Sequence, residues 1–79
     1  MYFTYVLYSE AHDKIYIGHT QDVDQRMKSH NETGDGYTKR YRPWRLVYSE
    51  RFSTRAAAMR REKALKGGKG RAWIRANLI

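Results

Sequence analysis

Aromatic and β-branched residues dominate the start of the chain and predict two paired strands. Residues 2–8 are almost entirely of these types, and a second short run at residues 15–17 follows after a polar stretch. Such residues favour extended backbone, and the polar stretch between the two runs suits a turn. The pattern therefore predicts an antiparallel hairpin.

The register of this hairpin decides where its tyrosines lie. With a four-residue loop at residues 9–12, Tyr8 would face Asp13 and Tyr5 would lie directly opposite Tyr16. Any register of the same parity would keep Tyr5 and Tyr16 as diagonal neighbours, whereas a slip of one residue would send one of them to the other face. We expect both rings on one face of the sheet.

Three helices and one further strand are predicted in the rest of the chain. Asp22 followed by Gln25 has the offset of a capping box. Ser53 or Thr54 can cap a second helix, and Gly67-Gly68 would end it. The predicted elements are a helix at residues 22–31, a strand at 45–50, a helix at 55–66 and a last short helix at about 70–78. The last helix is expected to pack through Trp73, Ile74 and Leu78.

Two of the predicted helices carry polar side chains whose surroundings matter for function. Arg26 and His30 are four residues apart and share one helix face, which projects either into a cleft or into water. Glu62 shares a face with Ala58 and Leu65, so a carboxylate stands among small and apolar neighbours. The ordinary alternative for Glu62 is a surface ion pair, which is the commoner role for a helix carboxylate. Its partners would be Arg61, Lys66 or Arg55.

Charge is unevenly distributed along the chain and points to a polyanionic partner. The chain carries sixteen Lys and Arg against eight Asp and Glu, a formal net charge of +8. Thirteen of the bases but only two of the acids follow residue 38. In so small a protein this surplus favours nucleic acid as a partner, and a solvated basic face is an equal alternative on composition alone.

The predicted loop at residues 34–45 combines turn formers, rings and cations. It contains Gly34, Gly36 and Pro43, the rings of Tyr37, Tyr41 and Trp44, and the cations Lys39, Arg40 and Arg42. Interleaved rings and cations suit contacts with phosphates together with stacking on bases or sugars. Trp44 and Tyr41 would serve equally well as anchors that pack the next strand into the core.

Several protein classes are disfavoured by what the sequence lacks. A length of 79 residues suits one domain, residues 1–79, and the absence of cysteine removes disulfides and thiolate chemistry. No apolar run approaches the roughly 18 residues of a membrane span, so we expect a soluble, cytoplasmic protein without membrane contact. The histidines lack zinc-binding spacing, and paired carboxylates for two metal ions are missing. One Mg²⁺ held by a single carboxylate, waters and a substrate phosphate remains available.

An ordered set of residues resembles the GIY-YIG nuclease domain over essentially the whole chain. The set comprises Thr4-Tyr5, then Tyr16-Ile17-Gly18, Arg26, His30, Glu62 within Arg60-Arg61-Glu62-Lys63, and Asn77. The chain resembles the short stand-alone bacterial members and is similar to the nuclease domain of the excision-repair incision subunit. It departs from the family pattern at Phe3-Thr4-Tyr5, which lacks the glycine of the first motif, and Asn77 matches by position more than by its neighbours.

The resemblance implies both a fold and an activity. The fold is of the α+β class, a small three-stranded antiparallel sheet flanked by helices, and it agrees with the strands and helices predicted above. The activity is that of a metal-dependent endonuclease that hydrolyses phosphodiester bonds in DNA, in repair or recombination, with one Mg²⁺ or Mn²⁺ ion.

The resemblance also implies a role for each member of the set. Glu62 would bind the metal, Arg26 would bind the scissile phosphate, and Tyr5 would be the general base. A phenol can act as a base near neutral pH only if its anion is stabilised, which Arg26, the metal and the basic half of the chain would do. The other members would assist: Tyr16 by supporting Tyr5 or the water, His30 by hydrogen bonding, and Asn77 by bracing the site.

DNA is the partner that the resemblance implies. The candidate contacts with its backbone are Lys39, Arg40, Arg42, Lys63, Lys66, Lys69 and Arg71. A domain this small carries no separate recognition module, so targeting would depend on the structure of the DNA or on a recruiting protein. The alternative is a non-catalytic nucleic-acid-binding module with the same fold.

Overall fold

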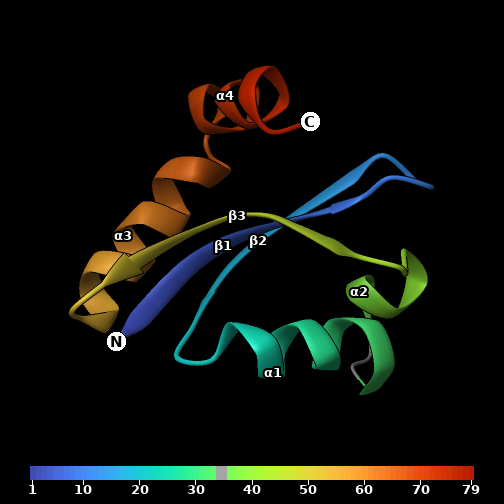
Figure 1. Ribbon diagram of the computed structural model, residues 1–79. Helices are drawn as coiled ribbons and strands as arrows, with labels where there is room; N and C mark the ends of the chain where they lie inside the picture. The colour runs from blue at the N-terminus through green and yellow to red at the C-terminus, as the bar shows by residue number, and fades with distance from the viewer. Residues whose placement is uncertain (34–35) are drawn as a thin grey trace.

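The computed structural model describes residues 1–33 and 36–79, and it confirms the α+β class (Figure 1). Gly34, one of the expected turn formers, lies outside the described residues. Three strands form the sheet: β1 (Tyr2–Ser9), β2 (Lys14–Thr20) and β3 (Arg45–Phe52). The helical segments are α1 (Val23–Lys28), the π-helical turn η1 (Ser29–Thr33), α2 (Tyr37–Arg40), α3 (Arg55–Lys66) and α4 (Gly68–Asn77).

The sheet is antiparallel with the order β2-β1-β3, so β1 is the central strand and β2 lies at an edge. Helices cover both of its faces, with α3 and α4 on one side and α1 and α2 on the other (Figure 1). Because β1 is covered on both faces, residues 4–9 are all buried and do not alternate between apolar and polar. A bulge in the pairing with β3 lies between Val6 and Leu7.

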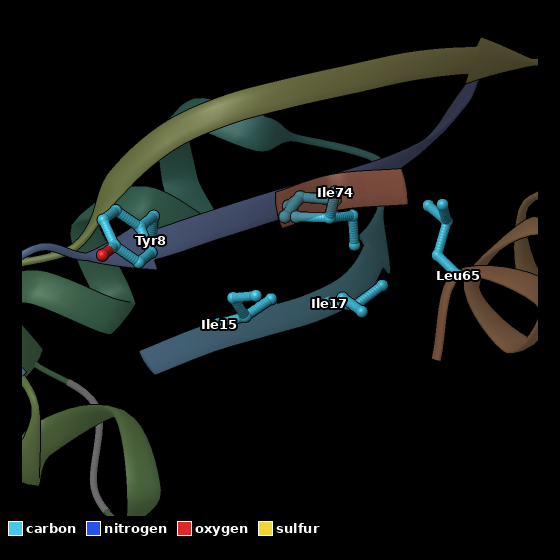
Figure 2. Close-up of a cluster of buried hydrophobic side chains, with 6 residues drawn as sticks. Tyr8, Ile15, Ile17, Leu65 and Ile74 are labelled. Atoms are coloured by element: carbon cyan, nitrogen blue, oxygen red, sulfur yellow. The ribbon is translucent and has the colours of Figure 1, made fainter. Parts of the chain in front are cut away.

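The first hydrophobic core fills the space between the sheet and the helices α3 and α4. Tyr8 of β1 and Ile15 and Ile17 of β2 face Leu65 of α3 and Ile74 of α4 (Figure 2). The prediction that α4 packs through its apolar residues is confirmed for Ile74, which is fully buried, and for Leu78. Trp73 differs, because it remains 38% exposed, and its ring meets the Tyr48 ring edge-on.

The second core lies on the opposite face of the sheet, under α1 and α2. Tyr5, Leu7 and Trp44 are buried there, and Tyr16 and Met27 pack against them. The indole N–H of Trp44 donates to the backbone oxygen of Thr38 at 2.8 Å. The Asn31 side chain bonds both the backbone N–H and the backbone carbonyl of Trp44. Trp44 is thus the core anchor that the sequence allowed.

The hairpin register differs from the predicted one by two residues. The structure pairs Tyr5 with Gly18 and Leu7 with Tyr16, so the expected direct opposition of the two tyrosines is wrong. The loop comprises residues 10–13, which allows the Tyr8 hydroxyl to donate to Asp13 at 2.8 Å. Because the parity is unchanged, Tyr5 and Tyr16 remain diagonal neighbours with ring centroids 6.2 Å apart.

Gly18 explains why the ring of Tyr5 can lie over the edge strand. A Cβ atom at this position would stand 2.7 Å from the Tyr5 hydroxyl oxygen and 3.1 Å from the Tyr16 ring. Both are closer than atoms in contact can be without moving a neighbour. The glycine of the Tyr16-Ile17-Gly18 motif is therefore required by the packing of the two tyrosines.

The start of α3 agrees with its predicted cap. Thr54 accepts a hydrogen bond from the backbone N–H of Ala57 at 3.2 Å, and α3 spans the predicted residues 55–66. Other segments differ: β2 spans Lys14–Thr20, β3 runs to Phe52, α4 begins at Gly68, and the helix that begins at Val23 changes to a π-helical turn after Lys28. The segment expected as a loop contains the short helix α2. In the described residues, no helix is both long and apolar enough to span a membrane.

Candidate active site

Tyr5, Tyr16 and His30 form a cluster of rings on the α1 face of the sheet. The Tyr5 hydroxyl and His30 Nε2 are 2.9 Å apart in a buried hydrogen bond. The rings of Tyr16 and His30 lie 4.6 Å apart, and Tyr5 stacks on Tyr16. Tyr5 is only 1% exposed and His30 only 4%, whereas Tyr16 is partly exposed. Of the two tyrosines, Tyr16 is the one that a bound molecule could contact.

Local capping and the π-helical turn place Arg26 and His30 beside these rings. The Asp22 side chain accepts from the backbone N–H of Gln25 at 3.0 Å and fixes the start of α1. The backbone oxygen of His30 then accepts from Arg42 Nε at 2.7 Å, which ties the end of the turn to the next segment. The face shared by Arg26 and His30 thus points toward the tyrosines and not into open water.

The Arg26 guanidinium bridges the cluster and a hollow at the protein surface. A hydrogen bond with Tyr5 raises the pKa of Arg26, and the nearby Tyr16 raises it further, whereas burial would lower it. Its Nε atom is buried and lacks a hydrogen-bond partner among the described residues. The hollow has a volume of about 400 Å³. Its lining consists of Tyr2, His19, Thr20, Gln21, Asp22, Arg26 and Arg55.

Glu62 lies on α3, and two cationic or hydrogen-donating side chains hold its carboxylate. His19 Nδ1 is 2.5 Å from one carboxylate oxygen, and Lys66 Nζ is 2.7 Å from the other. Burial alone would raise the pKa of Glu62, but Lys66 and His19 outweigh it and the net effect is a lowered pKa. The carboxylate is therefore ionised at neutral pH, with a side chain that is 17% exposed.

His19 connects the Arg26 side of the site with the Glu62 side. A second hollow of about 280 Å³ is lined by His19 together with Met59, Glu62, Lys63 and Lys66. Since His19 also lines the Arg26 hollow, the two hollows adjoin at this residue of the edge strand. The site therefore extends across the edge of the sheet, with Arg26 and the tyrosines to one side and Glu62 to the other.

The protonation states of the buried groups follow from burial and from neighbouring cations. Burial raises the pKa of Tyr5, and the adjacent Arg26 opposes that rise only in part. Burial also lowers the pKa of His30, and the positive charges of Arg26 and Arg42 lower it further. At neutral pH the Tyr5 phenol is therefore protonated and the His30 imidazole is neutral.

The remaining residues expected in the site lie outside this cluster. Asn77 is exposed on α4, and its side-chain amide donates to the backbone oxygen of Trp73 at 2.9 Å. Among the expected DNA contacts, Lys66 is bonded to Glu62, Arg42 to His30 and Arg71 to the backbone of Lys66. The others are exposed: Lys39, Arg40, Lys63 and Lys69.

Two residues of the site were not expected there from the sequence, namely His19 and Arg55, which was named only as a possible ion-pair partner of Glu62. His19 is two residues beyond Ile17 on the same strand, so strand alternation alone places it on the α3 face near Glu62. Arg55 lies in the first turn of α3, where its guanidinium stands 5.7 Å from the centroid of the Tyr2 ring. No spacing rule in the sequence connects Arg55 with Arg26.

Glu62 is the single carboxylate among the residues that line its hollow, and carboxylate oxygens are the ligands that a hard divalent cation prefers. The described residues contain no group of three or more His, Asp and Glu side chains that could enclose an ion. Glu62 supplies an ionised carboxylate on the wall of the hollow, and a bound cation would replace the His19 or the Lys66 contact on one of its oxygens. Mg²⁺ commonly binds through one or two carboxylates and completes its shell with waters and substrate phosphates.

Comparison with known proteins identifies relatives over most of the chain. The family model described as the GIY-YIG catalytic domain matches residues 1–75. A UPF0213 protein of Staphylococcus haemolyticus is 46% identical over 55 residues, which cover 68% of this chain and 67% of that protein. One from Natronomonas pharaonis is 40% identical over 67 residues, covering 82% of this chain and 76% of that protein. The solution NMR structure of a UPF0213 protein from Bacillus halodurans is 31% identical, has a TM-score of 0.56, and covers 96% of this chain and 84% of that one.

Proposed function

We propose that this chain, which belongs to the GIY-YIG catalytic domain family, is an endonuclease that hydrolyses phosphodiester bonds in DNA with one divalent metal ion. The observation that supports this most is the convergence of five side chains from five segments around the edge of β2. They are Tyr5, Tyr16, Arg26, His30 and Glu62. We place the activity in DNA repair or recombination, as the resemblance implies.

Arg26 is the proposed ligand of the scissile phosphate. A guanidinium forms paired, charge-assisted hydrogen bonds with phosphate oxygens, and Arg26 is partly exposed and lines the hollow of about 400 Å³. Arg55 lines the same hollow and adds a second positive charge. A phosphodiester in this hollow would lie between Arg26 and the His19 end of the site.

Glu62 is the proposed ligand of the metal ion, which is Mg²⁺ or Mn²⁺. When bound, such an ion would neutralise negative charge on the phosphate oxygens during cleavage. His19 acts as a positioning residue, because its hydrogen bond holds one oxygen of the Glu62 carboxylate. The Lys66 ammonium on the other oxygen lowers the pKa of Glu62 and keeps the carboxylate charged.

Burial distinguishes the roles of the two tyrosines in this proposal. The resemblance assigns the general base to Tyr5, but the Tyr5 hydroxyl is enclosed by His30 and Arg26 and its residue is 1% exposed. Tyr16 is partly exposed and, like Tyr5, lies beside the Arg26 guanidinium. We therefore assign proton abstraction from the attacking water to Tyr16, and assign to Tyr5 the positioning of Arg26 and His30.

A metal-titrated nicking assay on supercoiled plasmid and on branched DNA tests the proposal. We expect the wild-type protein to cut only with Mg²⁺ or Mn²⁺, and Glu62→Gln to lose this cleavage while retaining the fold and most DNA affinity. Glu50→Gln is the matched control, because Glu50 is a surface carboxylate paired with Arg61 at 3.0 Å. Binding without cleavage at every metal concentration would instead indicate a nucleic-acid-binding module.

A further inference from the structure

The segment from α2 to Trp44 presents a layered group of aromatic rings that the hydrolytic chemistry does not use. We call Tyr37, Tyr41 and Trp44 the aromatic platform. The ring centroids of Tyr37 and Trp44 are 6.0 Å apart with planes inclined by 32°, and those of Tyr37 and Tyr41 are 4.9 Å apart. Trp44 is 4% exposed at the base, whereas Tyr37 at the top is 47% exposed.

Hydrogen bonds beneath the exposed ring give the aromatic platform a fixed base. Trp44 is held at its indole nitrogen by the backbone of Thr38, and at its backbone by Asn31 at 2.6 and 3.0 Å. Tyr37 therefore rests on a buried ring whose position is set by three hydrogen bonds. A ring held in this way loses little conformational freedom when a planar ligand stacks on it.

Positive charge surrounds the aromatic platform. Lys14 Nζ is 5.3 Å from the Tyr41 ring centroid and the Arg40 guanidinium carbon is 5.7 Å from it, while the His12 ring packs against Tyr41 edge-on. Lys39, next to Arg40 on α2, is also exposed. Exposed rings beside cations are the arrangement that binds single-stranded nucleic acid, in which bases stack on the rings and phosphates meet the charges.

The aromatic platform is continuous with the catalytic cluster. Two ring contacts connect them, from Tyr16 to Trp44 at 6.2 Å and from Trp44 to Tyr37 at 6.0 Å. Successive nucleotides of a duplex strand rise by about 3.4 Å, so these two contacts correspond to a few nucleotides. A strand bound at Arg26 would therefore bring a nearby base to Tyr37.

We infer that Tyr37 stacks on an unpaired base of the DNA, a few nucleotides from the phosphate bound by Arg26. A paired base hides its faces in the helical stack, so a stacking residue outside the duplex selects unpaired nucleotides and tolerates any sequence. The preferred substrate is then a duplex with a flap, branch or overhang next to the cut. This inference rests on the proposed function for the identity of the partner as DNA, and its test does not require cleavage.

Binding in EDTA separates this inference from catalysis. The two probes share one sequence, a blunt duplex and the same duplex with a single-stranded overhang of about ten nucleotides, within the range that small single-strand-binding folds cover. We expect Tyr37→Ala to weaken overhang binding by roughly 5- to 150-fold, the loss caused by removing a stacking ring, and to change blunt-duplex binding less than about twofold. Tyr37→Trp should restore overhang binding, because it keeps a stacking ring.

Trp73→Ala is the matched control, because Trp73 is an exposed ring on α4, beyond the other face of the sheet. It should leave the ratio of overhang to duplex affinity unchanged. A second measurement uses only wild-type protein: 2-aminopurine in the overhang should lose fluorescence on binding if it stacks on a ring. Equal losses for both probes in Tyr37→Ala, or unquenched 2-aminopurine throughout the overhang, would overturn the inference whether or not the protein cuts DNA.

Discussion

Tyr5 and His30 are almost fully buried, so they act on a bound substrate through their neighbours. The Tyr5 hydroxyl contacts His30 Nε2 at 2.9 Å, and Tyr5 also raises the pKa of Arg26. The His30 ring packs against Tyr16 at 4.6 Å. Two buried residues thus fix the orientation of the two partly exposed residues, Arg26 and Tyr16, that can meet the substrate.

Burial of His30 predicts a loss of stability in mild acid. An unperturbed histidine titrates near pH 6.5, and in the folded protein burial and the charges of Arg26 and Arg42 lower the pKa of His30. As pH falls below about 6.5, the unfolded chain therefore binds a proton that the folded protein does not. We expect the free energy of unfolding to decrease by up to about 1.4 kcal/mol per pH unit until the folded pKa is reached.

Urea denaturation of wild type and His30→Gln at pH 7.5 and pH 5.5 measures this effect. The difference between the two pH values should be smaller in His30→Gln, because glutamine binds no proton in this range. The same pH dependence in both proteins would show that His30 is not the group responsible.

Elements whose limits depend on local signals could be predicted from the sequence, and those that depend on distant contacts could not. The α3 limits follow from Thr54 at its start and Gly67 at its end, both of which are visible in the sequence. The helix α2 has only four residues and depends on Trp44, whose indole binds the Thr38 carbonyl. Such a short helix has too few internal hydrogen bonds to form without tertiary contacts.

Asn31 is expected to hold the segment between η1 and β3 in place. Its side chain accepts from the Trp44 N–H at 2.6 Å and donates to the Trp44 carbonyl at 3.0 Å. Asn31→Ala should lower the free energy of unfolding by about 1–3 kcal/mol, because two partly buried backbone groups lose their partners.

Thermal or urea unfolding of Asn31→Ala and Asn77→Ala provides the comparison. Asn77 is the matched control because it is exposed and its side-chain amide donates to the Trp73 carbonyl of its own helix. A loss for Asn77→Ala as large as that for Asn31→Ala would contradict the role given to Asn31.

At the scale of the whole molecule, the fold could be predicted from the sequence more fully than the site. The three strands, the antiparallel hairpin of the first two and α3 follow from patterning and caps, whereas the three-stranded antiparallel sheet is what the resemblance implies. The shared face of Tyr5 and Tyr16 follows from the parity of the register. The register could not be predicted, since it depends on the room that Gly18 leaves for Tyr5. The pairing of His19 with Glu62 could not be predicted either, because it joins residues 43 positions apart.

The charge of the molecule predicts a strong salt dependence of DNA binding. Lysines that release counterions from phosphates make the logarithm of affinity fall linearly with the logarithm of salt concentration. Replacing Lys39, Lys63 and Lys69 by Ala should reduce that slope by about 0.9 for each lost contact with duplex phosphate. These three lysines are chosen because they are exposed. Arg42 is not replaced, because it donates a hydrogen bond to the His30 carbonyl and its loss would disturb the fold.

Fluorescence anisotropy with a blunt duplex over a range of salt concentrations measures the slope. A triple variant with the wild-type slope would show that these three lysines do not contact the DNA. A reduced slope without any change in the fold, checked by circular dichroism, is the expected result.

The central claim is that the tyrosines around Gly18 and the neighbouring Arg26 form a hydrolytic site, and the single-turnover cleavage rate of Tyr16→Phe tests it most directly. The substitution removes one hydroxyl and leaves the ring packing on His30. Tyr48→Phe, which loses a hydroxyl bonded to Glu50 away from the site, is the control. At saturating Mg²⁺ we expect the Tyr16→Phe rate to fall by about 10² to 10⁴, with unchanged melting temperature and DNA affinity, and Tyr48→Phe to cut normally. A wild-type rate for a folded Tyr16→Phe protein would contradict the account.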